Sequence, residues 1–279
     1  MCGRFVMATP VAELARLFGV PDRPNLAPRW NVAPTQEIAV IRARPPAAED
    51  GDGVNGDGMS GDGAAGAGAE PRPAAQLVPM RWGLVPFWAK EAGIGARLIN
   101  ARADTLAEKP AFREALKHRR CLIPADGFYE WSSVGGRKQP HYIHRRDGGV
   151  LAFAGLWESW RGPKGEPPLD PPLLTATIIT TEANATLRPL HGRMPVILAE
   201  GDRDRWLDPV TPVAQALALL RPAADDLLRA MPVSPRVNAV RNDDAACIRP
   251  LSEDGAGAEG AGRDGPDGGG DGEREPRLL

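Results

Sequence analysis

The second residue of the chain has the most distinctive chemistry. Removal of Met1 would leave Cys2 as the mature N-terminus. A terminal cysteine is a 1,2-aminothiol whose amine and thiol have ordinary pKa values of about 8 and about 8.5, so both nucleophilic forms exist near neutral pH. This group condenses with an aldehyde to an imine and then closes to a five-membered thiazolidine. The alternative is an incidental cysteine at a flexible terminus, which is less favoured because Gly3 permits close approach and Arg4 can hold an anion.

Two further residues are candidates for moving protons. Glu130 lies between Tyr129 and Trp131 after a turn-like Asp-Gly pair, and a carboxylate near aromatic surface can have its pKa raised as acid–base work requires. His191 precedes an apolar run, and histidine is the natural proton carrier near neutral pH. The alternatives are a solvated Glu130 on the polar side of a strand and a structural His191.

The segment from Ile99 to Thr105 combines an amide with a cation. Asn100 follows a strand-like run and could donate to a developing oxyanion or position an amine, while Arg102 could clamp a phosphate. Asp104 or Thr105 could cap a helix that starts near residue 105. Plain turn and cap chemistry explains the same residues equally well.

One basic residue stands among three aromatics around a Gly/Pro turn in the run MRWGLVPFW, at positions 80–88. Aromatic faces stack on unpaired bases while arginine contacts phosphate, which is the usual chemistry of single-strand binding. The aromatic residues of this run are therefore candidates for base stacking, and Arg81 is a candidate for contact with phosphate. The alternative for this run is that its tryptophans fill a core.

Composition limits the class of protein. The chain has 279 residues and a net charge of −2, but acidic residues concentrate in two segments, which leaves the remainder net basic. Three widely spaced cysteines argue against a disulfide framework and show no zinc-ligand spacing, so neither a metal nor a cofactor is expected. A reduced compartment suits them, and the sequence shows no signal peptide and no membrane-spanning run. We expect a soluble, cytoplasmic protein, associated with the nucleoid when DNA is bound.

Two segments are too poor in large apolar residues to form structure of their own. The acidic, Gly/Ala/Asp-rich stretch 45–75 is predicted to be a disordered insertion, and residues 251–279 a disordered acidic tail. The domain is then residues 2–250, interrupted once.

The elements that would position these residues are mostly strands. Strands are predicted at 37–42, 76–82, 95–99, 127–131, 139–145, 150–156 and 173–180. Helices are predicted at 11–18, with Thr9 as cap and Pro10 as first residue, and at 105–118, 201–207, 211–220 and 223–230. Strands and helices do not alternate regularly, so the fold class is α+β: a curled, barrel-like, mostly antiparallel sheet with peripheral helices.

Taken in order, five runs resemble one known family. They are Cys2-Gly3-Arg4, RWGLVPFW, NARADT, DGFYEW and HGRMPVIL. Together they are similar to the SRAP family, the SOS-response-associated peptidases or abasic site processing proteins, over roughly residues 2–245. Asp104 stands where the family is expected to favour glutamate, and the insertion is not part of its core pattern.

The resemblance implies covalent capture of abasic sites in single-stranded DNA by the mature Cys2, within a DNA-damage response. Its catalytic positions fall on Cys2, Asn100, Glu130 and His191. Its DNA-contacting positions fall on Arg4, Trp82, Arg102 and Arg193. The family name also implies autoproteolytic removal of whatever precedes Cys2, which here is Met1 alone. A monomer is expected.

Two other classes stay open at this point. An N-terminal-nucleophile amidohydrolase also begins Met-Cys-Gly and uses the terminal amine as the base for its own thiol. A non-covalent single-strand binder would make Cys2 incidental and would show salt-sensitive DNA binding without a stable adduct.

Overall fold

A computed structural model describes residues 2–44 and 75–251 of the chain. The segments predicted to be disordered, 45–75 and 251–279, lie outside the described residues except for Ala75 and Leu251. Ala75 is the first residue of a strand.

Five strands close into a barrel in the order β10-β4-β3-β6-β9 and back to β10. The β10–β4 pairing is parallel and the other four are antiparallel. The strands are β3 (Glu37–Ala43), β4 (Ala75–Trp82), β6 (Arg120–Ala125), β9 (Leu151–Trp160) and β10 (Leu173–Glu182). Two short strands, β5 (Asn100–Arg102) and β11 (Arg193–Pro195), extend the barrel by pairing with β10.

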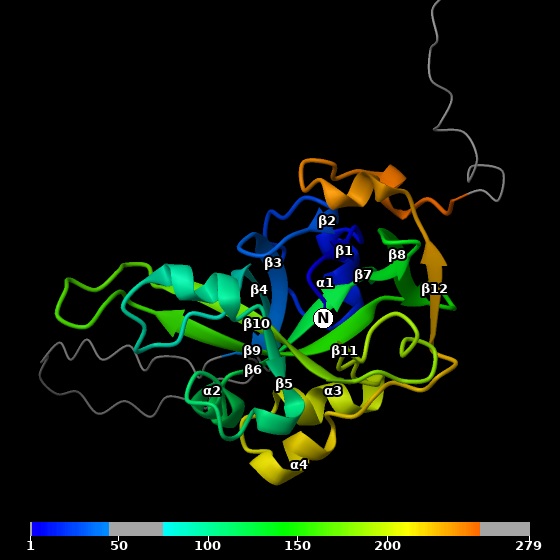
Figure 1. The fold of residues 1–279 in the computed structure, drawn as a ribbon. Helices are drawn as coiled ribbons and strands as arrows, with labels where there is room; N and C mark the ends of the chain where they lie inside the picture. Colours follow the sequence, from blue (N-terminus) through cyan, green and yellow to red (C-terminus); the bar gives the residue numbers. More distant parts are fainter. Residues whose placement is uncertain (1, 45–74, 252–279) are drawn as a thin grey trace, which may run out of the picture.

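A second, wholly antiparallel sheet has the order β12-β8-β7-β1-β2. Its strands are β1 (Phe5–Met7), β2 (Arg29–Val32), β7 (Gly127–Val134), β8 (Arg137–Arg145) and β12 (Leu228–Pro232). The strand next to the N-terminus is therefore held between two neighbours, and the chain begins in the middle of one face of the molecule (Figure 1). The predicted α+β class with a barrel-like, mostly antiparallel sheet is confirmed.

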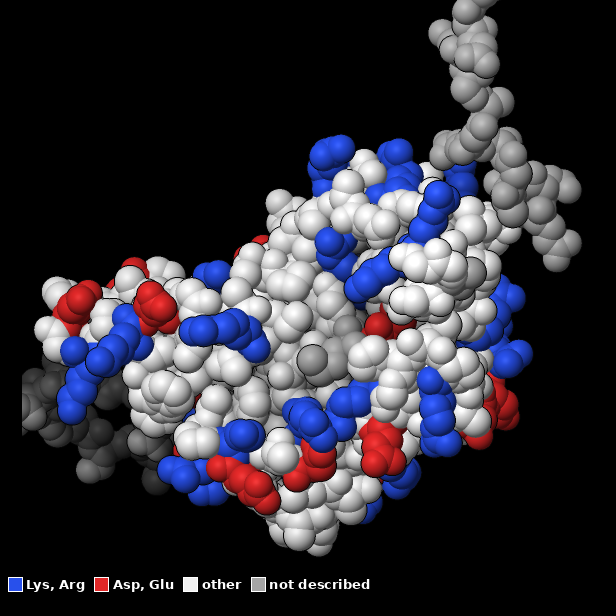
Figure 2. All heavy atoms as spheres, in the orientation of Figure 1, with Lys and Arg blue, Asp and Glu red and all other residues white. Residues whose placement is uncertain are grey.

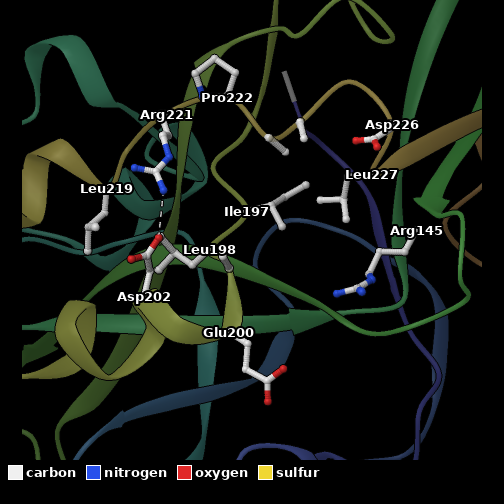
Figure 3. Close-up of a pocket in the computed structure, with 13 residues that line it drawn as sticks. Arg145, Ile197, Leu198, Glu200, Asp202, Leu219, Arg221, Pro222, Asp226 and Leu227 are labelled. Carbon is white, nitrogen blue, oxygen red and sulfur yellow. Dashed lines mark hydrogen bonds and ion pairs between the residues drawn. The ribbon is translucent and has the colours of Figure 1, made fainter.

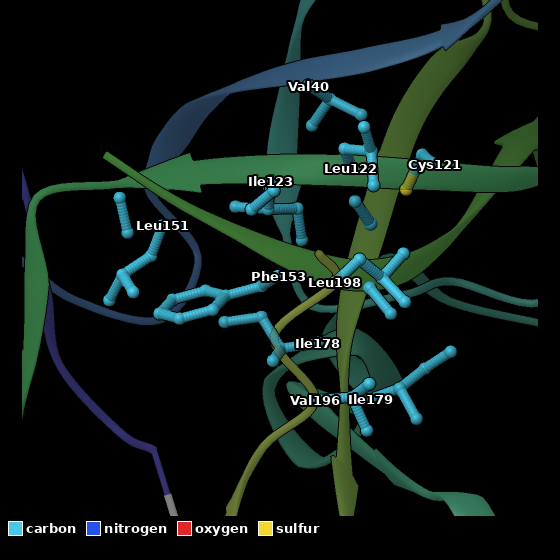
Figure 4. Packing of buried hydrophobic residues seen from close by; sticks show 14 of the residues in the cluster. Val40, Cys121, Leu122, Ile123, Leu151, Phe153, Ile178, Ile179, Val196 and Leu198 are labelled. Atoms are coloured by element: carbon cyan, nitrogen blue, oxygen red, sulfur yellow. The ribbon is translucent and has the colours of Figure 1, made fainter. Parts of the chain in front are cut away.

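The core consists of side chains from the barrel strands and from β1. Val40, Ile123, Phe153 and Ile178 are fully buried and converge from β3, β6, β9 and β10 (Figure 4). Phe5 packs edge-to-face against Trp82 at 5.1 Å and against Phe153 at 6.3 Å between ring centroids. This contact joins the two sheets and fixes the backbone that follows Cys2.

The helices are short and peripheral. They are α1 (Val11–Leu17), α2 (Arg113–His118), α3 (Glu200–Leu207) and α4 (Val213–Ala218), with 3-10 helices η1 (Ala92–Arg97), η2 (Ala103–Thr105), η3 (Pro235–Asn238) and η4 (Ala245–Ile248). α2, α3 and α4 lie together below the barrel (Figure 1). Buried Arg120 ties them to β6, because its guanidinium donates to carbonyls of Leu116 and Trp206 near the ends of α2 and α3.

Two predicted elements are wrong, and two helix starts are misplaced. Of the predicted helix 105–118, only Arg113–His118 is α-helical, because residues 103–105 form η2 and turns follow up to residue 112. Residues 95–99 are not a strand, since η1 covers their first half and the next strand begins at Asn100. Residues 223–230 are not a helix, because 228–232 form β12 in pairing with β8. Thr9 does not cap α1; its hydroxyl donates to Asp126 instead, and α1 begins after Pro10.

The segment 235–248, called here the C-terminal clasp, reaches back to the beginning of the chain. Buried Asn31 donates its amide to the carbonyls of Val237, Ala239 and Asn242 at 3.1, 3.2 and 2.7 Å. Asp243 accepts from the backbone N–H groups of Trp30 and Asn31 at 2.6 and 2.8 Å. These bonds hold the clasp over β2 (orange in Figure 1).

Candidate active site around Cys2

Cys2 is fully buried three residues before the start of β1, and its backbone is held from the barrel. The Asn100 side chain donates to the Cys2 carbonyl at 2.8 Å. Asn100 is placed for this by the parallel pairing of β5 with β10, in which it stands opposite Ile178. Two predicted site residues nearly a hundred positions apart are thus in direct contact.

The side-chain oxygen of Asn100 is the second polar atom of this residue near Cys2. Its Oδ1 is buried and has no hydrogen-bond partner among the described residues. Buried polar atoms are nearly always paired in native proteins, so an unpaired one calls for an explanation. The oxygen is an acceptor beside Cys2, suited to a donor such as an amine N–H or a sugar hydroxyl.

Glu130 is brought to the same place by the second sheet. β1 pairs with β7, so that Phe5 stands opposite Phe128 and the Tyr129 N–H donates to the Arg4 carbonyl at 3.0 Å. Glu130 follows on β7 with only 5% of its surface exposed, which excludes the solvated alternative. Its carboxylate is therefore a desolvated group close to the start of the chain.

The thiol of Cys2 reflects these surroundings. Burial raises its pKa well above the ordinary value, and the negative charge of Glu130 raises it further. The thiol is consequently protonated at neutral pH, and it needs a proton acceptor at the moment it attacks. Glu130 is near enough for its charge to act on the thiol.

His191 lies in the turn between β10 and β11. Its Nδ1 lies 3.0 Å from the backbone nitrogen of Arg193 and 3.3 Å from the carbonyl oxygen of the same residue. These contacts hold the ring against the start of β11.

Arg193 and Arg102 lie on strands that flank β10, and Asp104 stands between them. Arg193 donates to the Thr180 carbonyl at 2.6 Å, and its guanidinium is 3.7 Å from Asp104. Arg102 binds the same carboxylate through two hydrogen bonds of 3.1 and 2.6 Å. The hydrogen bond from Arg102 holds the pKa of Asp104 below its usual range. Asp104 therefore forms ion pairs with both cations.

Arg4 is half-buried on the opposite side of Cys2. One guanidinium nitrogen donates to Asn31 at 2.8 Å and to the Val237 carbonyl at 3.0 Å. Its position is therefore set by the C-terminal clasp. Figures 1 and 2 view the face where the chain begins, and Lys and Arg side chains surround the middle of that face.

Trp82 does not have the accessibility that base stacking needs. It is fully buried against Phe5, and its indole N–H donates to the Ile99 carbonyl at 2.9 Å. For this residue the core alternative describes the structure. The exposed aromatics of the same run are Phe87 and Trp88, with 58% and 49% of their surfaces exposed. Phe87 and Trp88 follow the Gly-Leu-Val-Pro turn, and this position in a loop is the sequence feature that distinguishes them from Trp82 at the end of β4.

A pocket of about 400 Å³ adjoins the Cys2 site. Apolar groups of Trp88, Leu98 and Phe112 line it, Asn100 forms part of its wall, and Arg102 and Lys109 bring positive charge. An apolar pocket edged by cations suits part of a nucleotide chain.

A second pocket, of about 460 Å³, lies elsewhere, between the start of α3 and residues 219–227 (Figure 3). Arg145 and Glu200 line it together with the ion pair of Arg221 and Asp202, 3.2 Å apart. It shares no lining residue with the site around Cys2.

Within residues 2–44 and 75–251, no helix has the length and apolar character needed to cross a membrane. No group of three or more His, Cys, Asp and Glu side chains in these ranges could hold a metal ion.

Comparison with known proteins gives a consistent result. A family model described as SOS response associated peptidase (SRAP) matches residues 1–240. The abasic site processing protein YoqW of Bacillus subtilis (strain 168) is 37% identical over 253 residues, covering 89% of this chain and 99% of that protein. The abasic site processing protein HMCES of Gallus gallus is 32% identical, covering 90% of this chain and 78% of that protein.

The fold is shared with a solved structure. An X-ray crystal structure of a protein from Bacteroides thetaiotaomicron superposes with a TM-score of 0.71 at 24% identity, covering 90% of this chain and 100% of that one. The order of the five motifs, the barrel and the sequence matches agree, and the chain belongs to the SOS response associated peptidase (SRAP) family.

Proposed function

We propose that this protein processes abasic sites in single-stranded DNA by capturing their aldehyde covalently on the mature N-terminal Cys2. The observation that carries the proposal is the contact of Cys2 with Asn100 beside the buried carboxylate of Glu130. The names of the relatives, abasic site processing proteins, supply the substrate class.

The chemistry begins with the amine that removal of Met1 exposes. Removal by general methionine processing or by the protein itself gives the same product. An abasic deoxyribose is mostly a closed hemiacetal, and ring opening frees its aldehyde. The Cys2 amine adds to that carbon, and the carbinolamine loses water to give an imine. Glu130 and His191 handle the protons of ring opening and dehydration.

The second step makes the product stable. The Cys2 thiol adds its sulfur to the imine carbon while its proton passes, through Glu130, to the nitrogen. The net change is one aldehyde and one aminothiol converted to one thiazolidine and one water. An open imine would act as an electron sink and promote β-elimination, which cuts the strand. Ring closure removes that route and shields the site.

Asn100 links the two reactants. Its Nδ2 already fixes the Cys2 backbone, and its buried Oδ1 is positioned to accept from the amine or from a sugar hydroxyl. Arg102 and Arg193 on one side and Arg4 on the other supply positive charge for the phosphates that flank the sugar.

The test is covalent capture itself. Purified protein is incubated with a single-stranded oligonucleotide containing one abasic site, heated, and run on a denaturing gel, with the intact oligonucleotide as control. We expect a heat-stable shifted band with the abasic oligonucleotide and none with the intact oligonucleotide. Salt-sensitive binding without that band would favour the non-covalent binder, and glutaminase activity would favour the amidohydrolase.

Arg193→Ala should weaken binding of every single-stranded sequence to a similar degree, because a phosphate contact carries no base information. Loss of one such contact should lower the slope of log affinity against log salt by about 0.7. Fluorescence titrations at several salt concentrations measure both quantities. Arg188→Ala, a change of the same kind in the β10–β11 turn, serves as control. An unchanged slope for Arg193→Ala would remove this residue from the DNA interface.

A further inference from the structure

The loop at residues 83–91, called here the aromatic loop, follows β4 and carries Phe87 and Trp88 in exposed positions. Contiguous exposed apolar surface on a protein commonly marks a binding site. Trp88 also lines the pocket that contains Asn100 and Arg102, so the loop lies beside the Cys2 site.

The base of the loop is closed by two glycines. Gly83 has a φ of +118°, and a Cβ on it would come within 2.4 Å of the Gly95 carbonyl oxygen. A Cβ on Gly95 would come within 2.5 Å of the Gly83 carbonyl oxygen. The Leu84 N–H also donates to the Leu98 carbonyl at 3.2 Å. The start of the aromatic loop is therefore held by backbone contact against residues 95–98, at the end of η1.

Three buried side chains from β9 and β10 hold the loop backbone from beneath. Thr175 accepts from the Val85 N–H at 2.9 Å, and Trp160 donates to the Ala89 carbonyl at 2.9 Å. Between these anchors, Glu158 accepts from the Phe87 N–H at 3.3 Å. Glu158 thus acts on the backbone of one of the two exposed aromatics.

Burial of the Glu158 carboxylate costs desolvation free energy. It is only 3% exposed, burial raises its pKa, and it forms an ion pair with Arg119. A buried carboxylate contributes little net stability even when paired, since desolvation offsets the Coulombic gain. A role in holding the aromatic loop accounts for its presence.

We propose that Glu158 is a positioning residue that holds Phe87 and Trp88 as a preformed stacking platform for the unpaired bases next to the abasic site. This inference rests on the proposed function. A platform that is already ordered avoids the entropy cost of ordering on binding. Loosening it should weaken DNA binding and leave the chemistry at Cys2 intact.

The experiment separates these two effects by using two aldehydes. One is the abasic oligonucleotide; the other is 2-deoxyribose 5-phosphate, which offers the same sugar aldehyde without bases. For Glu158→Met we expect the half-saturating oligonucleotide concentration to rise about tenfold, with the maximal rate within about twofold. The rate with the sugar phosphate should match that of the unchanged protein.

Three further variants make the result specific. Glu158→Gln keeps an oxygen that can accept from Phe87 and should restore most of the affinity. Glu91→Met removes an exposed carboxylate from the same loop and controls for the loss of charge near DNA. Trp160→Phe removes only the donor to the Ala89 carbonyl. It should likewise raise the half-saturating oligonucleotide concentration and leave the rate with the sugar phosphate unchanged. This variant tests the inference independently if Glu158→Met folds poorly.

An equal loss of rate with both aldehydes, or an unchanged half-saturation for Glu158→Met and Trp160→Phe, would overturn the inference. Failure of the unchanged protein to capture either aldehyde would instead overturn the proposed function. The two failures are therefore distinguishable in one set of measurements.

Discussion

The Cys2→Ala protein should form no heat-stable adduct with abasic single-stranded DNA, although it should still bind the strand. Alanine keeps the α-amine, so an imine can form, but no thiol is present to close the ring. The open imine promotes β-elimination, and we expect more strand cleavage than with the unchanged protein. Borohydride, which reduces imines to stable amines, should trap the species that Cys2→Ala forms.

Cys121→Ala is the matched control, because Cys121 is also fully buried but lies on β6 in the barrel core. It should retain the adduct. Cys2→Ser tests the same point from another side, since a hydroxyl cannot replace the thiol in a thiazolidine. A heat-stable crosslink that survives in Cys2→Ala would be incompatible with the mechanism.

Glu130→Gln should have the second largest effect, a fall of about 100-fold or more in the rate of adduct formation at saturating DNA. Burial and the Glu130 charge keep the Cys2 thiol protonated, so the attack needs a base and the amide is not one. The difference in rate between Glu130→Gln and the unchanged protein should become smaller as the pH is raised. At higher pH a larger fraction of the thiol is already thiolate and needs no carboxylate to accept its proton. Single-turnover gels over a pH series measure this directly.

DNA affinity should change little in Glu130→Gln, since the side chain is buried and phosphate contacts lie elsewhere. Glu37→Gln, at an exposed position at the start of β3, is the control for removal of one negative charge. A Glu130→Gln rate within a few-fold of the unchanged protein would move the proton transfer to His191 alone.

Local sequence predicted the strands of the fold better than its helices. Residues 37–42 and 173–180 have the β-branched composition of buried strands, and both are barrel strands. Residues 223–230 are rich in helix-forming residues, but their last part pairs with β8, and tertiary contact overrides propensity there. Residues 95–99 read as a strand because the close contact of Gly83 and Gly95 is invisible in one sequence.

The candidate site was predicted residue by residue but not as an arrangement. Nothing local shows that Asn100 contacts Cys2, because that contact depends on the register of β5 with β10. The carbonyls that hold Arg4 and the clasp residues around Asn31 are likewise long-range features. Trp82 shows the converse limit, since an aromatic beside an arginine has the same local pattern whether it faces DNA or the core.

The C-terminal clasp has a consequence for the order in which the site is assembled during synthesis. Cys2 is among the first residues made, but Arg4 is held by a carbonyl 233 residues later in the chain. At about 5–20 residues per second, the interval between them is about 10–50 s. The contact that sets the position of Arg4, two residues after Cys2, therefore forms only after nearly all of the described chain has been synthesised.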